Sequence, residues 1–387
     1  MGFFRERNCY LKDYNLSFKD KCKRFSFIFT FYIFCVVGIG LGILYSVGGG
    51  NWSPWALKQL MRFLLGLALY LIIAFTNLRM WMKYAYWIYG ITLALLVGVE
   101  VMGTIGMGAQ RWLDLGVFQL QPSELMKITL ILALARYFHG AGLEDIRTIR
   151  SALIPIGMIL VPTALILKQP DLGTALMLIF AGSMMLFLAG VQIWKFICVG
   201  ILGATSVPIL WSFLHDYQKQ RVLTFLDPEK DPLGAGYHIM QSKIALGSGG
   251  LWGKGFLEGT QSRLNFLPEK QTDFIFTVLS EEFGFVGSMI LLALFALIIL
   301  YGFIITVRCT NFFGKFLAFG LTANFALYIF INVGMVMGLL PVVGVPLPLV
   351  SYGGTAMLTL MMGFGLIQCV HINSDMEIGR RGSIDDE

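Results

Sequence analysis

The sequence predicts an all-α, polytopic membrane protein of ten transmembrane helices, with one large extracytoplasmic loop between helices seven and eight. Hydrophobic residues make up 57% of the 387 residues and charged residues only 13%, whereas a soluble domain carries about 25% charged residues. The mean hydropathy is +0.73, and the apolar runs reach the roughly 20 residues that a transmembrane helix needs. The predicted spans are 25–46, 57–76, 82–102, 123–139, 151–168, 172–190, 192–214, 274–306, 315–340 and 347–372.

The chain is expected to have three parts, of which only the middle one lies in the membrane. Residues 1–24 are polar and basic, and the apolar run after them is long enough to span, which is unlike a cleavable signal peptide. The membrane domain then covers 25–372 and includes the extracytoplasmic loop 215–273. A short cytoplasmic tail, 373–387, follows the last span.

Lysine and arginine residues gather at alternate junctions between the spans, and this asymmetry predicts the orientation. Junctions rich in these residues face the cytoplasm, so ten spans place both termini there. The net charge of +6 therefore reports topology, and no nucleic-acid partner is expected. The basic junctions hold Arg79 and Lys83, Arg136, Arg147 and Arg150, Lys195, Arg308 and Lys315, and Arg380 and Arg381.

The six cysteines and four histidines form no pattern that indicates chemistry. No cysteine lies in the loop 215–273, and neither residue type has the spacing of a disulfide framework or a metal site.

The loop 215–273 is predicted to form the active site. It is glycine-rich and of mixed charge, and long polar loops of this kind are usually functional. Residues 236–247 are expected to form a short amphipathic helix on the membrane face. Lys243, Lys254 and Arg263 are candidates for phosphate contacts, although a single lysine or arginine is more often a solvated surface charge.

Asp273 directly precedes the eighth span and is the candidate catalytic residue. It could cap that helix, or it could be a carboxylate that is kept ionised to accept a hydroxyl proton. The spacing alone does not separate these two interpretations. Glu281 and Glu282 follow two turns deeper, where a carboxylate rarely lacks a partner, and Glu281 lies nearer the Asp273 face.

The junction before the fourth span combines Arg111 and Trp112 with Glu124 and Lys127. Lys127 lies about 6 Å inside the span by helix rise, and an intramembrane lysine indicates a functional site. Glu124 and Lys127 are three residues apart and can pair on one helix face. The alternative is a purely structural ion pair with helix capping and interfacial anchoring by Trp112.

Two other junctions on the same side carry candidate residues. Asp171 begins the sixth span, where a helix N-terminal charge and a substrate contact are equally good interpretations. Residues 332–357 contain three prolines and five glycines, and irregular backbone at this depth indicates the wall of a cavity. Ser351 lies in this segment and is a candidate for substrate binding.

In the fifth span, Pro155 and Pro162 are expected to interrupt the helix.

These segments together resemble the SEDS family (shape, elongation, division and sporulation), the RodA and FtsW proteins of bacterial cell-wall synthesis. The likeness extends over nearly all of the ten-span region and favours the elongation branch, RodA. Family members often have a histidine where this chain has Gln271, so no histidine relay stands beside Asp273. The matching segments are QRWLDLG, QPSELMK, QPDLGTA, FLDPEKDPLGAGYHIMQSKIALGSGGLWGKGFLEGTQSRLNFLPEKQTDFIF, EEFGFVG and NVGMVMGLLPVVGVPLPLVSYGG.

The resemblance implies a peptidoglycan glycosyltransferase that polymerises lipid II. The 4-hydroxyl of GlcNAc attacks the lipid-linked MurNAc of another chain, undecaprenyl pyrophosphate leaves, and the anomeric centre inverts. The essential aspartate of the family falls on Asp273, and cations would hold the leaving pyrophosphate. The candidate substrate-binding residues are Arg111, Trp112, Glu124, Lys127, Asp171, Lys243, Lys254, Arg263, Glu281 and Ser351.

The resemblance also implies partners and a location. A class B penicillin-binding protein would supply transpeptidation and activate the polymerase, beside other membrane proteins of the elongation complex. The protein would lie in the cell inner membrane. Cofactor use is open: Asp231 and Glu258 could contribute to binding a divalent cation, Mg²⁺ or Mn²⁺, but no ligand cluster indicates one.

Two alternatives belong to other functional classes. A lipid II flippase or transporter would suit a cavity with charged residues, but it needs two alternating openings and no catalytic base. A scaffold of the elongation complex would not explain the intramembrane Lys127 and Glu281.

Overall fold

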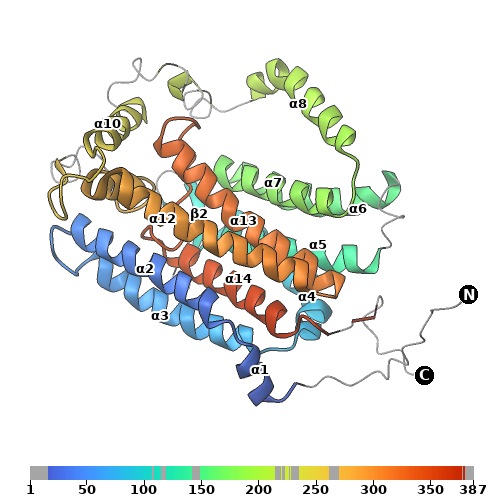
Figure 1. Cartoon of the computed structure of the whole chain (residues 1–387). Helices are drawn as coiled ribbons and strands as arrows, with labels where there is room; N and C mark the ends of the chain where they lie inside the picture. The colour runs from blue at the N-terminus through green and yellow to red at the C-terminus, as the bar shows by residue number, and fades with distance from the viewer. Residues whose placement is uncertain are drawn as a thin grey trace, which may run out of the picture.

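Apolar helices build the molecule, and one of them coincides with each of the ten predicted spans (Figure 1). The computed structural model describes residues 16–106, 109–114, 119–141, 149–213, 219, 223–225, 227, 235–260, 270–376 and 378–379. The helices at the predicted spans are α2 (Phe27–Val47), α3 (Trp55–Ala74), α4 (Leu78–Met102), α5 (Pro122–Gly140), α6 (Ile149–Lys168), α7 (Leu172–Leu188), α8 (Ile193–Phe213), α12 (Ile275–Arg308), α13 (Phe312–Val336) and α14 (Gly354–Ile372).

Within the described residues, six helices are long and apolar enough to cross a membrane. They are α2, α3, α4, α12, α13 and α14, and shorter apolar helices lie within α6, α7 and α8. The chain is thus a multi-pass, all-α membrane protein, as predicted. The number of ten spans stays a prediction.

Two helix details differ from the expectation. Helix α6 is continuous, although Pro155 and Pro162 lie inside it; prolines are tolerated in membrane helices because neighbouring groups satisfy the freed backbone. Helix α14 begins at Gly354 rather than at 347, because the proline-rich segment before it forms turns and extended chain.

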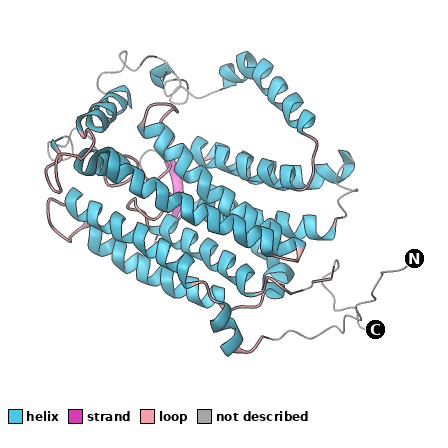
Figure 2. Ribbon diagram, in the orientation of Figure 1, coloured by secondary structure: helices cyan, strands magenta, loops and turns pink. Residues whose placement is uncertain are grey.

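Short elements occupy the junctions that were predicted to face outward. A small antiparallel sheet of β1 (Thr104–Gly106), β2 (Ala109–Asp114) and β3 (Gln119–Leu120) precedes α5 (Figure 2). Helix α10 (Ala235–Ser248) confirms the short helix predicted in the long loop.

Near the N-terminus, α1 (Phe18–Arg24) leads into α2.

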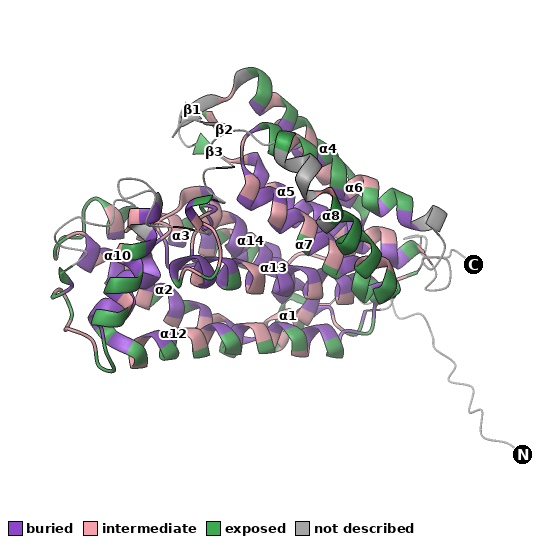
Figure 3. Cartoon of the chain, turned by 90° about the horizontal axis from the view of Figure 1, so that it is seen from above, coloured by how far each residue is buried: buried purple, intermediate pink, exposed green. Residues whose placement is uncertain are grey.

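The core lies where α13 packs between α5, α7, α12 and α14, while α14 also packs on α3 and α12 on α2. Most residues of α5 and α13 are buried, whereas α12 is buried over residues 275–282 and exposes one side from Phe283 onward (Figure 3). The central helices are also where polar side chains are buried, which places a polar site inside an apolar bundle.

Candidate functional site

Asp273 stands just outside the helix that follows it. It lies in a turn that leads to α12, and the N-cap position belongs to Phe274, which makes no side-chain cap bond. The N-cap position thus lies one residue later than the cap interpretation of Asp273 requires. Its side chain is half-buried, and a Cβ atom added to Gly344 would lie 3.6 Å from its Oδ2 atom. The carboxylate thus faces the proline-rich segment between α13 and α14.

Asn332 of α13 fixes the backbone of Asp273. Its Nδ2 atom donates to the carbonyl oxygens of Asp273 at 2.9 Å and of Val345 at 2.7 Å. One fully buried amide thereby joins the turn before α12 to the proline-rich segment. Because a buried amide without partners costs free energy, this pairing makes the position of Asp273 specific.

Ser351 fixes the preceding residue in the same way. Its hydroxyl donates to the carbonyl of Thr272 at 2.6 Å and accepts from the backbone N–H of Leu347 at 2.8 Å. Next to it, the N–H of Tyr352 donates to the carbonyl of Gln271 at 2.8 Å. The structure therefore places Ser351 beside the catalytic candidate, as a residue that holds backbone.

Gln59 of α3 completes this arrangement. Its Nε2 atom donates to the carbonyl of Ser351 at 2.9 Å, and its Oε1 atom accepts from the N–H of Gly353 at 3.3 Å. We call Gln59, Asn332 and Ser351 the Asp273 clasp. The sequence analysis missed Gln59 and Asn332, although an amide inside an apolar span was a signal that could have found them.

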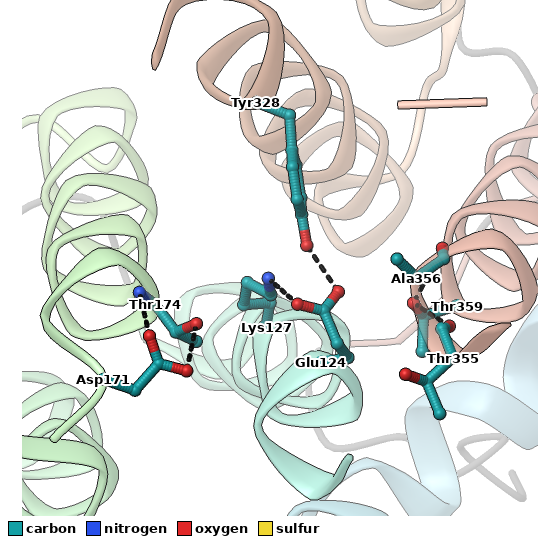
Figure 4. A network of polar contacts seen from close by, with 8 residues as sticks. All are labelled: Glu124, Lys127, Asp171, Thr174, Tyr328, Thr355, Ala356 and Thr359. Carbon is teal, nitrogen blue, oxygen red and sulfur yellow. Dashed lines mark hydrogen bonds and ion pairs between the residues drawn. The ribbon is translucent and has the colours of Figure 1, made fainter. Parts of the chain in front are cut away.

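A second polar group lies deeper in the bundle and centres on Glu124 and Lys127 of α5 (Figure 4). Lys127 Nζ is 2.6 Å from Glu124 Oε1, and the hydroxyl of Tyr328 donates to Glu124 Oε2 at 2.6 Å. The Lys127 ammonium also lies 4.3 Å from the ring centroid of Tyr328. All three side chains are buried, so the ion pair predicted from the spacing is confirmed. We call these three residues the ion-pair centre.

Two cavities adjoin the ion-pair centre. Both are small. One has a volume of about 20 Å³ and is lined by Glu124, Asn324, Tyr328 and Thr359 among apolar residues. The other, of about 10 Å³, is lined by Tyr328 together with Gln59 and Ser351 of the clasp. Tyr328 of the ion-pair centre therefore lines both cavities, including the one beside the Asp273 clasp. Residues of the proline-rich segment line the second cavity, which agrees with the predicted role of that segment.

Arg111 and Asp171 meet at the turn between α6 and α7. The Arg111 guanidinium donates to the carbonyls of Gln169, at 3.2 Å, and of Pro170. Asp171 caps α7, because its carboxylate accepts from the N–H of Thr174 at 3.2 Å and from its hydroxyl at 2.9 Å (Figure 4). The capping interpretation of Asp171 is thus confirmed. Arg111 and its neighbour Trp112 lie on β2.

The lysines of the long loop differ from one another. Lys243 is exposed on α10, and its stem lies over Gly338, where an added Cβ would be 2.2 Å from Lys243 Cε. Lys254 pairs with Glu281, with 2.8 Å between Nζ and Oε1. Arg263 lies outside the described residues. Burial lowers the pKa of the Lys270 ammonium, three residues before Asp273.

Metal ligands do not cluster in the part of the chain that the structure describes. No group of three or more histidine, cysteine, aspartate or glutamate side chains gathers there. Glu258 is exposed, and Asp231 lies outside the described residues.

Comparison with known proteins finds similar chains over most of the length. The chain is 49% identical over 321 residues to the peptidoglycan glycosyltransferase MrdB of Escherichia coli K12, covering 82% of this chain and 86% of that protein. It is 36% identical over 277 residues to the stage V sporulation protein E of Bacillus subtilis, covering 71% and 75%.

Solved structures share the fold. A chain of a peptidoglycan synthase complex that coordinates polymerization and crosslinking superposes with a TM-score of 0.78 at 31% identity, covering 91% of this chain and 99% of that one. The rod shape determining protein RodA of Thermus thermophilus gives 0.70 at 28% identity, covering 91% and 98%. The family model of FtsW, RodA and SpoVE, described as cell cycle protein, matches residues 22–376. The resemblance read from the motifs is confirmed, and this chain belongs to the FtsW, RodA and SpoVE family.

Proposed function

We propose that this chain is a peptidoglycan glycosyltransferase that polymerises lipid II into β-1,4 glycan strands during cell elongation and cell-shape control. The relatives named as peptidoglycan glycosyltransferases support the activity. The observation that carries the assignment of the site is the Asp273 clasp. Asn332 and Ser351 bond the backbone carbonyls of Asp273 and Thr272, while the half-buried carboxylate stands outside the helix. A carboxylate held in this way suits a general base.

In the proposed reaction, Asp273 accepts the proton of the GlcNAc 4-hydroxyl. The hydroxyl oxygen forms a bond to the anomeric carbon of a lipid-linked MurNAc as the bond to the pyrophosphate oxygen breaks. The electron pair leaves with undecaprenyl pyrophosphate, and the anomeric centre inverts. Charge develops on the pyrophosphate, and nearby cations stabilise it most where water is excluded.

The charged residues have different roles in stabilising the leaving pyrophosphate. Lys127 is buried and charge-balanced by Glu124, so the pair supplies a fixed dipole within the bundle rather than a net positive charge. Lys243 is exposed on α10 and is the candidate that can reach a phosphate directly. Arg111 orients the α6–α7 turn through two backbone carbonyls, and its three further N–H groups can serve a ligand.

The proposed partner is a class B penicillin-binding protein, with other membrane proteins of the elongation complex around it. The similar chain from a peptidoglycan synthase complex that coordinates polymerization and crosslinking supports this partner. The protein lies in the cell inner membrane in this proposal, with both termini in the cytoplasm. The basic junctions support this orientation.

The test is polymerisation of purified lipid II by the chain co-purified with its penicillin-binding partner. Wild type is compared with Asp273→Ala and with Asp20→Asn, a matched control at an exposed aspartate of α1. We expect polymer from wild type and from the control, and none from Asp273→Ala that still co-elutes with the partner. Polymer from Asp273→Ala at the wild-type rate would remove the catalytic assignment. Lipid II transfer across liposomes without polymer would favour the flippase.

A further inference from the structure

Helix α12 is broken at Gly284, nine residues after its first residue, Ile275. Gly284 has φ 66° and ψ −160°, a conformation that is essentially restricted to glycine. A Cβ atom at this position would lie 2.3 Å from the backbone nitrogen of Gly253. The break is therefore occupied by the backbone of the long loop, which enters the helix at this point.

Two carbonyl groups that the break releases are taken up by the loop. In a continuous helix, the carbonyls of Glu281 and Glu282 would accept from residues four positions later. Here the Glu281 carbonyl accepts from the N–H of Lys254 at 3.0 Å, and the Glu282 carbonyl accepts from the N–H of Gly255 at 3.1 Å. These two helix carbonyls therefore bond N–H groups of the loop instead of N–H groups of the helix.

The two N–H groups on the other side of the break are satisfied in the same way. Phe285 donates to the carbonyl of Gly250 at 2.9 Å, and Val286 donates to the carbonyl of Leu251 at 3.1 Å. Two helical hydrogen bonds are therefore replaced by four bonds to one loop segment. We call residues 250–255 with 281–286 the loop splice.

An ion pair reinforces the loop splice. Lys254 Nζ donates to Glu281 Oε1 at 2.8 Å, and the hydroxyl of Thr260 donates to the same oxygen at 3.0 Å. Lys254 Nζ also donates to the Thr260 hydroxyl at 2.7 Å. The Glu281 side chain is fully buried, whereas 28% of the Lys254 side chain is exposed. One oxygen of this buried carboxylate therefore bonds both a cation and a hydroxyl of the loop.

The segment that the splice holds is the one that follows Asp273. Residues 275–283 form the part of α12 before the break, and its first residue is two positions after Asp273. At its outer end, the hydroxyl of Ser242 on α10 lies 2.9 Å from that of Thr277 and donates to the carbonyl of Val336 at 2.8 Å. Loop groups thus hold this short helical segment at both ends.

We propose that Lys254 and Glu281 are positioning residues, whose ion pair fixes the segment 275–283 and through it the Asp273 carboxylate. This inference rests on the proposed role of Asp273 as the base. The sequence suggests both residues as candidate substrate contacts, whereas the structure places them in an ion pair with each other. Because a displacement of about 1 Å at a catalytic group can cost about 100-fold in rate, the ion pair acts on turnover rather than on substrate affinity.

The test measures kcat and KM for lipid II with the complete partner complex. Lys254→Met removes the Lys254 ammonium from the buried Glu281 carboxylate, and we expect kcat to fall about 10-fold to 100-fold with KM within about twofold. Lys254→Arg keeps the charge and the bond, so it stays near wild type. Adding Glu281→Gln to Lys254→Met removes the stranded charge and recovers part of kcat.

Two further variants test whether the loss of kcat is specific to the Lys254–Glu281 ion pair. Lys195→Met changes a lysine at the start of α8, on the predicted cytoplasmic side, and leaves kcat unchanged. Thr260→Val removes one weaker bond to Glu281 and lowers kcat less than Lys254→Met does. If Asp273→Ala polymerises lipid II at the wild-type rate, the assignment of Asp273 as the general base is wrong, whatever the kinetics of the Lys254 variants.

Three outcomes would overturn the inference while Asp273→Ala is inactive. A rise in KM with unchanged kcat in Lys254→Met would make Lys254 a phosphate ligand. Wild-type kinetics in that variant would make the ion pair irrelevant to the site. If Lys254→Met fails to co-elute with the partner, the comparison passes to Thr260→Val and Lys254→Arg. An equal loss of kcat in these two variants, together with no recovery of kcat in the double variant Lys254→Met, Glu281→Gln, would contradict positioning by the ion pair.

Discussion

Two lysine–carboxylate pairs in this molecule have the same chemistry and different constructions. Lys127 and Glu124 lie one turn apart on α5, with 2% and 6% of their side chains exposed. Lys254 and Glu281 come from a loop and a helix that are 27 residues apart in the chain, with 28% and 0% exposed. The first pair is built into a single rigid element, whereas the second joins two elements.

The difference teaches what each pair can control. A pair within one helix turn forms whenever that helix forms, so it places a fixed dipole in the bundle interior. A pair between a loop and a broken helix forms only when the two elements meet, so it reports and fixes their relative position. The pair on α5 therefore contributes a local field, and the pair between loop and helix contributes the alignment of Asp273.

The largest expected effect comes from Lys127→Met. It leaves the Glu124 carboxylate buried without its cation, and breaking a buried pair costs about 3–5 kcal/mol. We expect a clearly lower thermal unfolding midpoint in detergent, and part of the loss should return when Glu124→Gln is added. An unchanged midpoint would mean that water reaches this pair.

Lys254→Met should destabilise the protein less. Its ammonium is partly exposed, and Thr260 still donates to Glu281, so we expect a loss of about 1–3 kcal/mol. The same unfolding measurement applies. A loss as large as that of Lys127→Met would show that the two pairs are equivalent, which contradicts the comparison.

Salt sharpens the comparison further. At about 1 M salt the Debye length falls to about 3 Å, so the partly exposed Lys254–Glu281 pair is screened and the buried Lys127–Glu124 pair is not. The difference in unfolding midpoint between wild type and Lys254→Met should shrink between 0.1 and 1 M salt by comparison with that of Lys127→Met. Equal shrinkage in both variants would contradict this account.

The smallest expected effect is that of Thr260→Val. It removes one hydroxyl that bonds Glu281 and Lys254, and a single such bond is worth about 0.5–1.5 kcal/mol. The shift in unfolding midpoint should be smaller than that of Lys254→Met. A larger shift would place the hydroxyl, rather than the ammonium, at the centre of the splice.

The sequence predicts the local part of this architecture well. The ten helical segments follow from runs of apolar residues, and the Glu124–Lys127 pair follows from a spacing of three, because both depend on neighbours along one helix. The importance of the loop and of Asp273 came from charge placement and from family motifs. The role of Asp171 as a helix cap was one of two readings that the helix start allowed.

The long-range part was not predictable. The spacing of Lys254 and Glu281 follows no helical period, and their pairing depends on the break at Gly284. In the sequence, Asn332 is one polar residue in an apolar span. Its role is visible only in the fold, where its side chain donates to the carbonyls of Asp273 and Val345. Contacts between elements depend on the closure of the whole bundle, which leaves no periodic signal in the chain.

The most direct test of the central claim compares Asp273→Asn with Asp273→Glu in lipid II polymerisation at saturating substrate. Asparagine keeps the size and removes the base, and general base catalysis is worth about 100-fold to 10,000-fold, so we expect a loss of that order. Glutamate keeps the base but displaces it, so its rate should fall between the asparagine variant and wild type. A wild-type rate for Asp273→Asn would contradict the account, because the proton would then have to go elsewhere.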